Sequence, residues 1–156
     1  MKNREDKNYI FRPVSQKDSK RLWEIRNQPA VRRKSNNSAE ISWDSHKIWF
    51  KKKYFSGEKN HCFVLADGQD LAIGYCRLDY DKKKNSYITS IAMDLAYIGR
   101  GLGYELLNKA LKKFHSKKNV LAEIKKENVR SIKLFQKNNF KIYKEDEKNY
   151  YLKHIS

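Results

Sequence analysis

The sequence predicts an α+β fold in which a mixed central sheet of six to seven strands is flanked by about four helices. Three strand-like segments follow one another directly, at residues 61–66, 71–80 and 87–93. A helical pattern from residue 101 then leads to another strand-like segment at residues 120–124, as a crossover connection would. Consecutive strands followed by a crossover helix indicate a mixed sheet with helices on both faces, not a doubly wound parallel sheet.

The first elements are a strand and a helix. Residues Tyr9–Val14 alternate in polarity and are rich in residues that favour strands. Ser15 stands three positions before Asp18, which is the spacing of a capping box at the start of a helix. We expect this helix to run to about Asn27, and we expect Pro29 to end it.

A second helix is predicted after the polar loop at residues 35–38. Ser42 is the expected N-cap, because apolar and aromatic side chains then recur at spacings of three and four residues. These side chains are Trp43, His46, Phe50 and Tyr54. The spacing puts His46 on the apolar face of the helix.

The three central strands are separated by short turns. Asp67-Gly68 is a hairpin signal between the first two strands, and the charged segment DKKKN, residues 81–85, separates the second strand from the third. This arrangement predicts that neighbouring segments of the chain pair directly in the sheet.

The segment YIGRGLGYELL, residues 97–107, joins the third central strand to the clearest helix of the chain. Its glycines at positions 99, 101 and 103 allow a close approach of the backbone, and the first N–H groups of a helix bind phosphate readily. The helix is marked by apolar residues at helical spacing: Leu102, Leu106, Leu107, Ala110, Leu111 and Phe114. Glycines alone leave two alternatives open, a phosphate-binding loop and a flexible turn without a ligand.

The C-terminal part of the chain predicts a strand, a helix and two closing strands. The strand covers residues 120–124, and Asn128 is the expected cap of the helix that carries Val129, Ile132 and Phe135. The closing strands are expected near residues 140–144 and 150–154. Because no repeat or linker separates these elements, we expect residues 1–156 to form a single domain.

Composition limits the classes of function. The chain has 35 Lys and Arg against 18 Asp and Glu, a net charge of +17 that attracts anionic ligands. No apolar run approaches the roughly 20 residues that span a bilayer, and Met1–Asp6 is too polar for a secretory signal, so we expect a cytoplasmic protein without a membrane partner. The lysine excess is more typical of a solvated surface than of a nucleic-acid site.

Cysteine and histidine spacing gives no sign of a metal site or of disulfides. Cys62 and Cys76 form neither a CxxC pair nor a disulfide framework, so we expect them to be reduced and buried in strands. The four histidines do not have the spacing of zinc ligands; they are His46, His61, His115 and His154.

Two motifs resemble the GNAT superfamily of acyl-CoA-dependent N-acyltransferases. The pattern (Gln or Arg)-x-x-Gly-x-(Gly or Ala) of the family's pyrophosphate loop is similar to residues 98–103, with Ile98 in place of the first polar residue. The later family pattern Asn-x-x-(Ser or Ala)-x-x-x-(Tyr or Phe)-x-Lys-x-Gly-Phe resembles NVRSIKLFQKNNF, residues 128–140. Asn139 replaces the glycine of that pattern, and asparagine tolerates a left-handed backbone better than most residues.

The resemblance implies acetyl-CoA as co-substrate and no metal. By family likeness, the pantetheine arm would lie along one strand, the diphosphate would lie on the glycine loop, and further contacts would come from the later helix. The implied cofactor-binding residues are Ile91, Ala92, Met93, Gly99, Arg100, Gly101, Leu102, Gly103, Tyr104, Asn128 and Phe135.

The N-terminal half resembles the acetyltransferases of bacterial nonulosonic-acid (pseudaminic-type) biosynthesis, which act on an amino group of a UDP-linked deoxysugar. Shared features are an Arg-Asn-x-Pro segment at residues 26–29, a His-x-x-Trp-Phe helix at residues 46–50 and a Gly-x-x-Arg strand at residues 74–77. The resemblance implies an anionic nucleotide sugar as substrate, contacted by Arg26, Asn27, His46 and Arg77. It leaves a homodimer open.

The catalytic residues are less clear from the sequence. Relatives place a tyrosine acid where this chain has Phe135, and related sugar acetyltransferases often carry glutamate where this chain has Ile88. We name His46 as candidate base. Ser90, Ser131, His46 or an ordered water could substitute for the missing acid, which the sequence leaves unassigned, and Ser131 is kept as a candidate catalytic residue.

Other functions remain open at this stage. A ribosomal-protein-type N-terminal acetyltransferase would have the same fold and opens with a similar Arg-Pro strand, as in Phe11-Arg12-Pro13. A binding module without catalysis, for nucleic acid or acyl-CoA, is the alternative of a different class.

Overall fold

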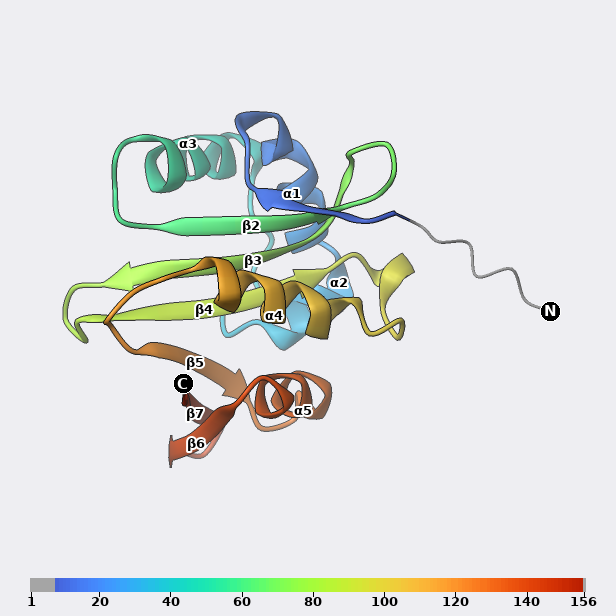
Figure 1. Cartoon of the computed structure of the whole chain (residues 1–156). Coiled ribbons are helices and arrows are strands. Elements are labelled where there is room, and N and C mark those ends of the chain that lie inside the picture. The colour runs from blue at the N-terminus through green and yellow to red at the C-terminus, as the bar shows by residue number, and fades with distance from the viewer. Residues whose placement is uncertain (1–7, 156) are drawn as a thin grey trace.

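A computed structural model describes residues 8–155, and within this range the chain forms a seven-stranded sheet and five α-helices (Figure 1). The strands are β1 (Ile10–Pro13), β2 (His61–Ala66), β3 (Ala72–Asp81), β4 (Ser86–Met93), β5 (Val120–Lys125), β6 (Phe140–Glu145) and β7 (Asn149–His154). The helices are α1 (Ser19–Arg26), α2 (Pro29–Lys34), α3 (Trp43–Phe55), α4 (Leu102–Lys113) and α5 (Val129–Lys137). Short 3-10 turns cover Gln16–Asp18 and Leu95–Tyr97.

The sheet has the order β1-β2-β3-β4-β5-β7-β6. Strands β1 to β4 form an antiparallel meander, and β5, β7 and β6 form a second antiparallel group. The two groups meet where β4 and β5 pair in parallel, connected by the crossover helix α4. The α+β class predicted from the sequence is therefore confirmed.

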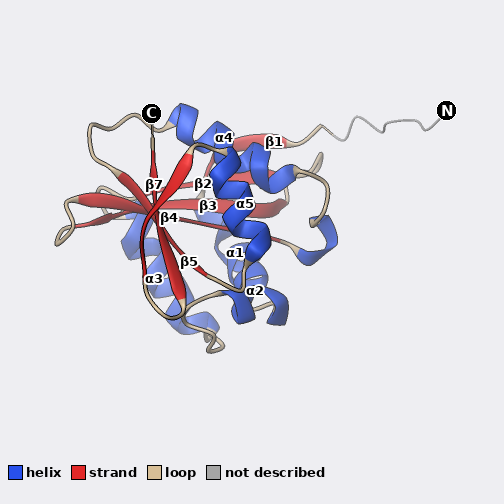
Figure 2. Ribbon diagram, turned by 90° about the horizontal axis from the view of Figure 1, so that it is seen from below, coloured by secondary structure: helices blue, strands red, loops and turns tan. Residues whose placement is uncertain are grey.

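The helices cover both faces of the sheet. Figure 2 shows α4 and α5 on one face and α1, α2 and α3 on the other. Beneath α4 and α5, the core contains Leu106, Leu107 and Phe135, together with inward side chains of the central strands. Beneath α1 and α3, a second core contains Ile25, Phe50 and others. Helices α1, α3, α4 and α5 thus bury one face each against the shared sheet, whereas α2 has no buried residue.

Local sequence signals account for most helix boundaries. Asp18 accepts a hydrogen bond of 2.8 Å from the Ser15 N–H, which is one half of the expected capping box, and the Asp18 N–H donates to the Ser15 carbonyl. Ser42 caps α3 by accepting a hydrogen bond from the Ser45 N–H, and Asn128 caps α5 in the same way through the Ser131 N–H. Asn139 follows α5 with a φ of +66°, the left-handed conformation that its amide side chain tolerates.

One prediction for the N-terminal half was wrong. Pro29 was expected to end a helix before a loop, but it begins α2, a further helix of six residues. Proline suits the first turn of a helix, because its missing N–H would have no partner there and its φ is already helical. α1 ends at Arg26, and α2 raises the number of α-helices from the expected four to five within residues 8–155.

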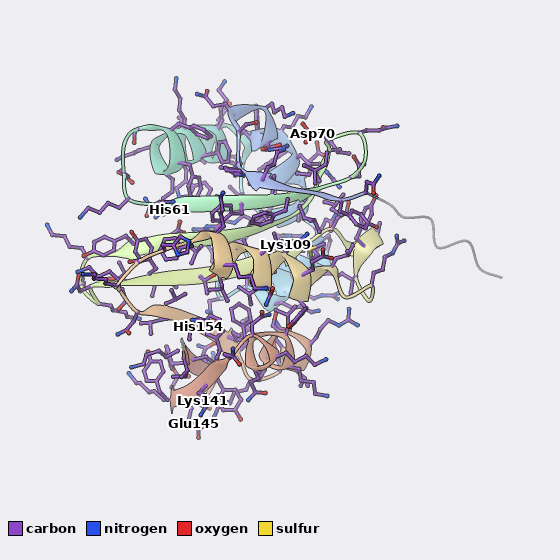
Figure 3. The ribbon with its side chains drawn as sticks, viewed as in Figure 1. His61, Asp70, Lys109, Lys141, Glu145 and His154 are labelled. Carbon is purple, nitrogen blue, oxygen red and sulfur yellow. The ribbon has the colours of Figure 1, made fainter. Side chains whose placement is uncertain are left out.

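The described cysteines and two of the histidines lie on several strands of the sheet. Cys62 on β2 and Cys76 on β3 are buried and free. His61 on β2 and His154 on β7, both labelled in Figure 3, are separated by three strands of the sheet. Among residues 8–155, no group of three or more His, Cys, Asp or Glu side chains is arranged to hold a metal ion. None of the helices in the same range is long and apolar enough to cross a bilayer.

His46 makes the stability of the fold depend on pH. Its ring is 2% exposed and packs on α3 among Trp43, Trp49 and Phe50. Burial lowers the pKa of His46 from 6.5 to about 4, against a smaller opposing effect of the Ser19 backbone. As the pH falls from 6.5 to 4, the unfolded chain gains a proton that the folded chain excludes, so the free energy of unfolding decreases.

We predict that replacing His46→Phe removes this pH dependence, an effect of about 2 to 3 kcal/mol between pH 6.5 and 4. Urea unfolding at a series of pH values measures it, with His115→Gln as a control at an exposed histidine. An unchanged pH profile in His46→Phe would contradict the assignment.

Candidate active site

A cavity opens where two central strands part. β4 and β5 are paired only at Tyr87↔Val120 and Ile88↔Leu121, although both strands continue for several residues beyond these pairs. Figure 1 shows the two strands diverging from this point. Beyond Ile88 and Leu121 their facing edges therefore lack sheet partners, and a cavity of about 330 Å³ lies there.

Both faces of the sheet contribute to the cavity wall. From the α4 and α5 side come Ile91, Met93, Ile98, Gly103, Leu134 and Phe135. From the α1 and α2 side come Arg26, Ala30, Val31 and Lys34, and β3 adds Tyr75 and Arg77. Apolar side chains predominate on the first side, although Asn128, Arg130 and Ser131 also line it. The second side is made basic by Arg26, Lys34 and Arg77. A ligand in the cavity would thus pass through the sheet between two chemically different chambers.

The glycine loop leads into the N-terminus of α4, next to the apolar side of the cavity. Gly99 and Gly101 have φ values of +86° and +76°, which side chains rarely adopt, and a Cβ at either position would point into open space. Gly101 is the N-cap of α4 and supplies no side chain to the first-turn N–H groups. Within residues 8–155, no acceptor binds the N–H groups of residues 101–104. They are free donors at the positive end of a helix.

The neighbours of these glycines hold the loop in place. Leu102 is 6% exposed and anchors the first turn in the core. A Cβ on Gly103 would lie 2.8 Å from Leu134 Cδ1, so this glycine allows α4 and α5 to approach closely. The guanidinium of Arg100 lies 5.1 Å from the centre of the Tyr97 ring and donates a hydrogen bond to the Ala96 carbonyl.

Asp94 connects the glycine loop to α1 and to the residues between α1 and α2. Its carboxylate caps the turn Leu95–Tyr97 through the Ala96 N–H and accepts hydrogen bonds from Gln28 and Arg21. Gln28 also accepts a hydrogen bond from the Leu95 N–H at 2.9 Å. Burial alone would raise the pKa of Asp94, but these hydrogen bonds outweigh it and hold the pKa below its usual value. The α1–α2 junction and the glycine loop are therefore one connected unit.

A profile of the acetyltransferase (GNAT) domain matches residues 8–141 of the chain. The chain belongs to the GNAT acetyltransferases. It is thus an N-acetyltransferase by family, as the two C-terminal motifs indicated. A comparison with curated protein sequences gives no match.

Solved structures of other GNAT proteins have the same fold. An N-acetyltransferase from Staphylococcus aureus Mu50 has a TM-score of 0.78 and 21% identity, covering 94% of this chain and 97% of that chain. A phosphinothricin acetyltransferase from Sinorhizobium meliloti, in complex with AcCoA, has a TM-score of 0.80 and 15% identity, covering 94% and 87%. A ribosomal-protein-alanine N-acetyltransferase from Brucella melitensis has a TM-score of 0.77 and 17% identity, covering 94% and 99%. At these identities the likeness shows the fold alone.

The structure brings six of the eleven expected GNAT cofactor residues into the cavity wall. Those in the cavity wall are Ile91, Ala92, Met93, Gly103, Asn128 and Phe135. Gly99, Arg100, Gly101, Leu102 and Tyr104 are not in the wall, but they belong to the loop and first helical turn that reach the cavity at Gly103. Phe135 is 2% exposed and packs edge-to-face on Phe140, so its ring has a clear packing role.

The expected acceptor residues divide into two groups. Arg26 and Arg77 lie in the cavity wall, as does Ser131, the candidate acid. Asn27 does not, because its amide exchanges two hydrogen bonds with the backbone of Ile41 and fixes the loop before α3. His46 is also absent from the wall, since its ring is enclosed by the aromatic side chains of α3. The position of His46 does not support a role as base.

Glu123 was missed by sequence reasoning. It is the one carboxylate among the described residues that line the cavity, and its Oε1 accepts a hydrogen bond of 3.3 Å from Asn36 Nδ2. The side chain projects from β5, the strand that parts from β4. Because side chains alternate along β5, Glu123 faces away from the core. In the sequence such a residue cannot be distinguished from any other charged residue that faces solvent, because the separation of β4 from β5 is a feature of the tertiary structure.

Proposed function

We propose that this GNAT protein transfers the acetyl group of acetyl-CoA to the primary amine of a UDP-linked amino deoxysugar. The observation that carries the proposal is the continuous cavity between β4 and β5. It connects an apolar chamber beside the glycine loop with a polar, basic chamber that contains one carboxylate, Glu123. A thioester donor and an anionic acceptor carrying an amine suit these two chambers.

The residues present fit the CoA group. The free N–H groups of residues 101–104 would bind the diphosphate, with the open space above Gly99 and Gly101 leaving room for it. The unpaired edge of β4 near Ile91–Met93 would hold the pantetheine amides, and Asn128 would add a donor, since its Oδ1 is used by the Ser131 N–H. When bound, acetyl-CoA would supply the acetyl group as a thioester.

Glu123 is the proposed general base. The attacking amine must be neutral, and one proton must leave its nitrogen as the new amide bond forms. The Glu123 carboxylate would accept that proton, with Asn36 orienting it. The Ser131 hydroxyl, at the start of α5, is proposed to donate a hydrogen bond to the departing thiolate, in place of the tyrosine that Phe135 cannot provide. The thiolate then takes its proton from solvent. Positioning the amine against the carbonyl carbon supplies much of the remaining rate enhancement.

The acceptor chamber supports a sugar nucleotide more than a peptide. Its wall has hydrogen-bonding side chains from Ser35, Asn36 and Asn37, together with the hydroxyl of Tyr75 and two arginines. Hydroxyls of a sugar and oxygens of a phosphate would find partners there. A peptide N-terminus brings no phosphate to the positive charges of Arg26, Lys34 and Arg77.

The substrate class is tested by thiol release. We predict that the wild-type protein releases CoA from acetyl-CoA in the presence of UDP-amino deoxysugars, with little release in the presence of peptides that have a free α-amine. Mass spectrometry of the products would show the acetyl group on the sugar nitrogen. Efficient acetylation of peptides, with no turnover of UDP-amino sugars, would replace the sugar proposal by a protein N-terminal acetyltransferase.

The glycine loop gives a second prediction. Gly101→Val forces a branched side chain into the space proposed for the diphosphate, so we expect the Kd for acetyl-CoA to rise about tenfold or more, equivalent to at least about 1.4 kcal/mol. Isothermal titration calorimetry measures the change. Gly57→Val is a matched control, because Gly57 has a similar φ of +81° and open space but lies between α3 and β2. Unchanged acetyl-CoA affinity in Gly101→Val would reject the loop assignment.

Glu123 gives a third prediction. We expect Glu123→Gln to lower kcat by roughly 10²- to 10⁴-fold near neutral pH, the usual contribution of a general base, with little change in the Kd for acetyl-CoA. Higher pH should recover part of the loss, since more of the amine is then neutral. Glu127→Gln removes a nearby carboxylate that is outside the cavity wall and serves as the control. Equal kcat values for the two variants would show that the base is another group.

A further inference from the structure

The backbone of the glycine loop has few bonds of its own to hold it. Within the described part of the chain, the backbone N–H groups of Gly99 and Arg100 donate no hydrogen bond. Glycine has more backbone freedom than any other residue, so this stretch does not fix its own path. On one side the loop is anchored by the buried side chain of Leu102. On the other side it begins at the turn Leu95–Tyr97, and the position of that turn therefore determines the path of the loop.

Gln28 bonds to this turn through both ends of its side-chain amide. Its Nε2 donates to Asp94 Oδ1 at 3.0 Å, and its Oε1 accepts from the Leu95 N–H at 2.9 Å. The amide has one possible orientation, because a carboxylate can only accept and a backbone N–H can only donate. Glutamine is the side chain of this length that offers both a donor and an acceptor at neutral pH.

The backbone of Gln28 joins α1 to α2. Its N–H donates to the Ile25 carbonyl at 3.2 Å, at the end of α1. Its carbonyl accepts from the Val31 N–H at 2.9 Å and from the Arg32 N–H at 3.0 Å, and so begins α2. α2 buries none of its own residues, yet it contributes to the basic side of the cavity wall. Gln28 thus begins a helix on the acceptor side and supports a turn on the donor side.

Asp94, the partner of Gln28, is fixed to the sheet. Its N–H donates to the Ile73 carbonyl at 2.8 Å, which continues the pairing of β3 with β4. Arg21 donates to Asp94 Oδ2 through Nη2 and to the Ala72 carbonyl through Nε, at 2.8 Å for the second bond. The carboxylate is therefore held in place and its charge is compensated, so Gln28 is bonded to a group with a defined position.

We propose that Gln28 is a positioning residue for the diphosphate of acetyl-CoA. Gln28 is not among the residues that line the cavity, so it acts through the turn Leu95–Tyr97 and not by touching the ligand. By fixing this turn, it sets the backbone path through Gly99 and Gly101 to the free N–H groups at the start of α4. The inference rests on one part of the proposed function, the placement of the diphosphate on the glycine loop, and is independent of the acceptor. A residue between the acceptor-side helices thus determines the affinity for the donor.

The first test uses two acyl donors that differ in the diphosphate. Gln28→Met keeps the length of the side chain and removes both of its hydrogen-bonding groups. We expect the Kd for acetyl-CoA, measured by calorimetry, to rise about tenfold, as the loss of these two hydrogen bonds implies. S-acetylpantetheine keeps the thioester and the amides but lacks the diphosphate. In ligand-observed NMR titrations it should bind the wild-type protein and Gln28→Met equally well.

Gln69→Met is the matched control for this substitution. Gln69 is an exposed glutamine between β2 and β3, and it is outside the cavity wall. We expect Gln69→Met to leave the Kd of both acyl donors unchanged.

Gln28→Glu gives an independent readout, the pH profile of acetyl-CoA affinity. The introduced carboxylate still offers an acceptor to the Leu95 N–H, but it faces Asp94, and this repulsion raises the pKa of the introduced group. The other charged groups recorded at this junction are Arg21, which bonds to Asp94, and Glu24, whose carboxylate lies 3.5 Å from Arg21 Nη1. Once protonated, the introduced carboxyl again has a donor for Asp94.

The expected pH profile follows from this protonation. Relative to the wild-type protein, the Kd of Gln28→Glu for acetyl-CoA should be raised at about pH 8 and should return toward the wild-type value at about pH 5.5. Gln28→Met has no group that titrates, so its ratio to the wild-type Kd should be constant. A role of Gln28 in general stability alone would not make acetyl-CoA affinity recover at low pH in one variant and not in the other.

The outcomes separate the role of Gln28 from the proposed function. Equal losses of affinity for acetyl-CoA and S-acetylpantetheine in Gln28→Met would indicate a general loosening of the cavity and would overturn the role of Gln28. An unchanged Kd for acetyl-CoA, or no recovery of Gln28→Glu at low pH, would also overturn it. If Gly101→Val weakens acetyl-CoA binding while Gln28→Met does not, the role of Gln28 is lost and the loop assignment stands. If Gly101→Val has no effect, the loop assignment itself is lost.

Discussion

The short parallel pairing of β4 with β5 is the constraint on which the rest of the site depends. Two residue pairs join these strands, and beyond them the strands diverge. The divergence leaves strand edges with unpaired N–H and C=O groups, and such groups are costly to bury without partners. An extended ligand rich in amides would satisfy them. The split therefore creates both the cavity and a reason for a ligand to occupy it.

The crossover helix makes this split compatible with a stable sheet. α4 leaves the end of β4 and returns the chain to β5, so its N-terminus is necessarily close to the place where the strands part. Its apolar face is anchored by Leu106 and Leu107, which are fully buried. The positive end of the helix is then held rigidly beside the cavity, where an anion would be stabilised without further rearrangement.

The two chambers are mechanically connected. Arg26, at the end of α1, lines the cavity, and two residues later Gln28 bonds to Asp94 and to the Leu95 N–H in front of the glycine loop. A movement of the segment between α1 and α2 would therefore strain the hydrogen bonds of Gln28 with Asp94 and Leu95, next to the glycine loop. This geometry favours a site in which donor and acceptor are positioned by a common framework, as direct transfer between two bound substrates requires.

The sequence predicted the parts of the molecule that local chemistry determines. Periodicity and caps at Ser42 and Asn128 located α3 and α5, and the glycines located the start of α4. Pro29 was misjudged because proline ends one helix and begins another equally well. The role of Glu123 could not be inferred from β5 alone, since its value as a base depends on a strand separation that only the tertiary structure creates. Likewise, periodicity placed His46 on the apolar face of its helix. Only the tertiary structure shows that the His46 ring packs against Trp49, and that Trp49 in turn contacts the guanidinium groups of Arg26 and Arg77.

The central claim is that acetyl-CoA occupies the gap between β4 and β5 and bonds to both the β4 edge and the glycine loop. Amide hydrogen exchange of the full chain, with and without acetyl-CoA, tests this claim most directly. The account predicts added protection at residues 90–93 and 101–104 together, with little change in the remote β6–β7 hairpin. Protection confined to surface lysine segments, or absent from both stretches at saturating acetyl-CoA, would contradict it.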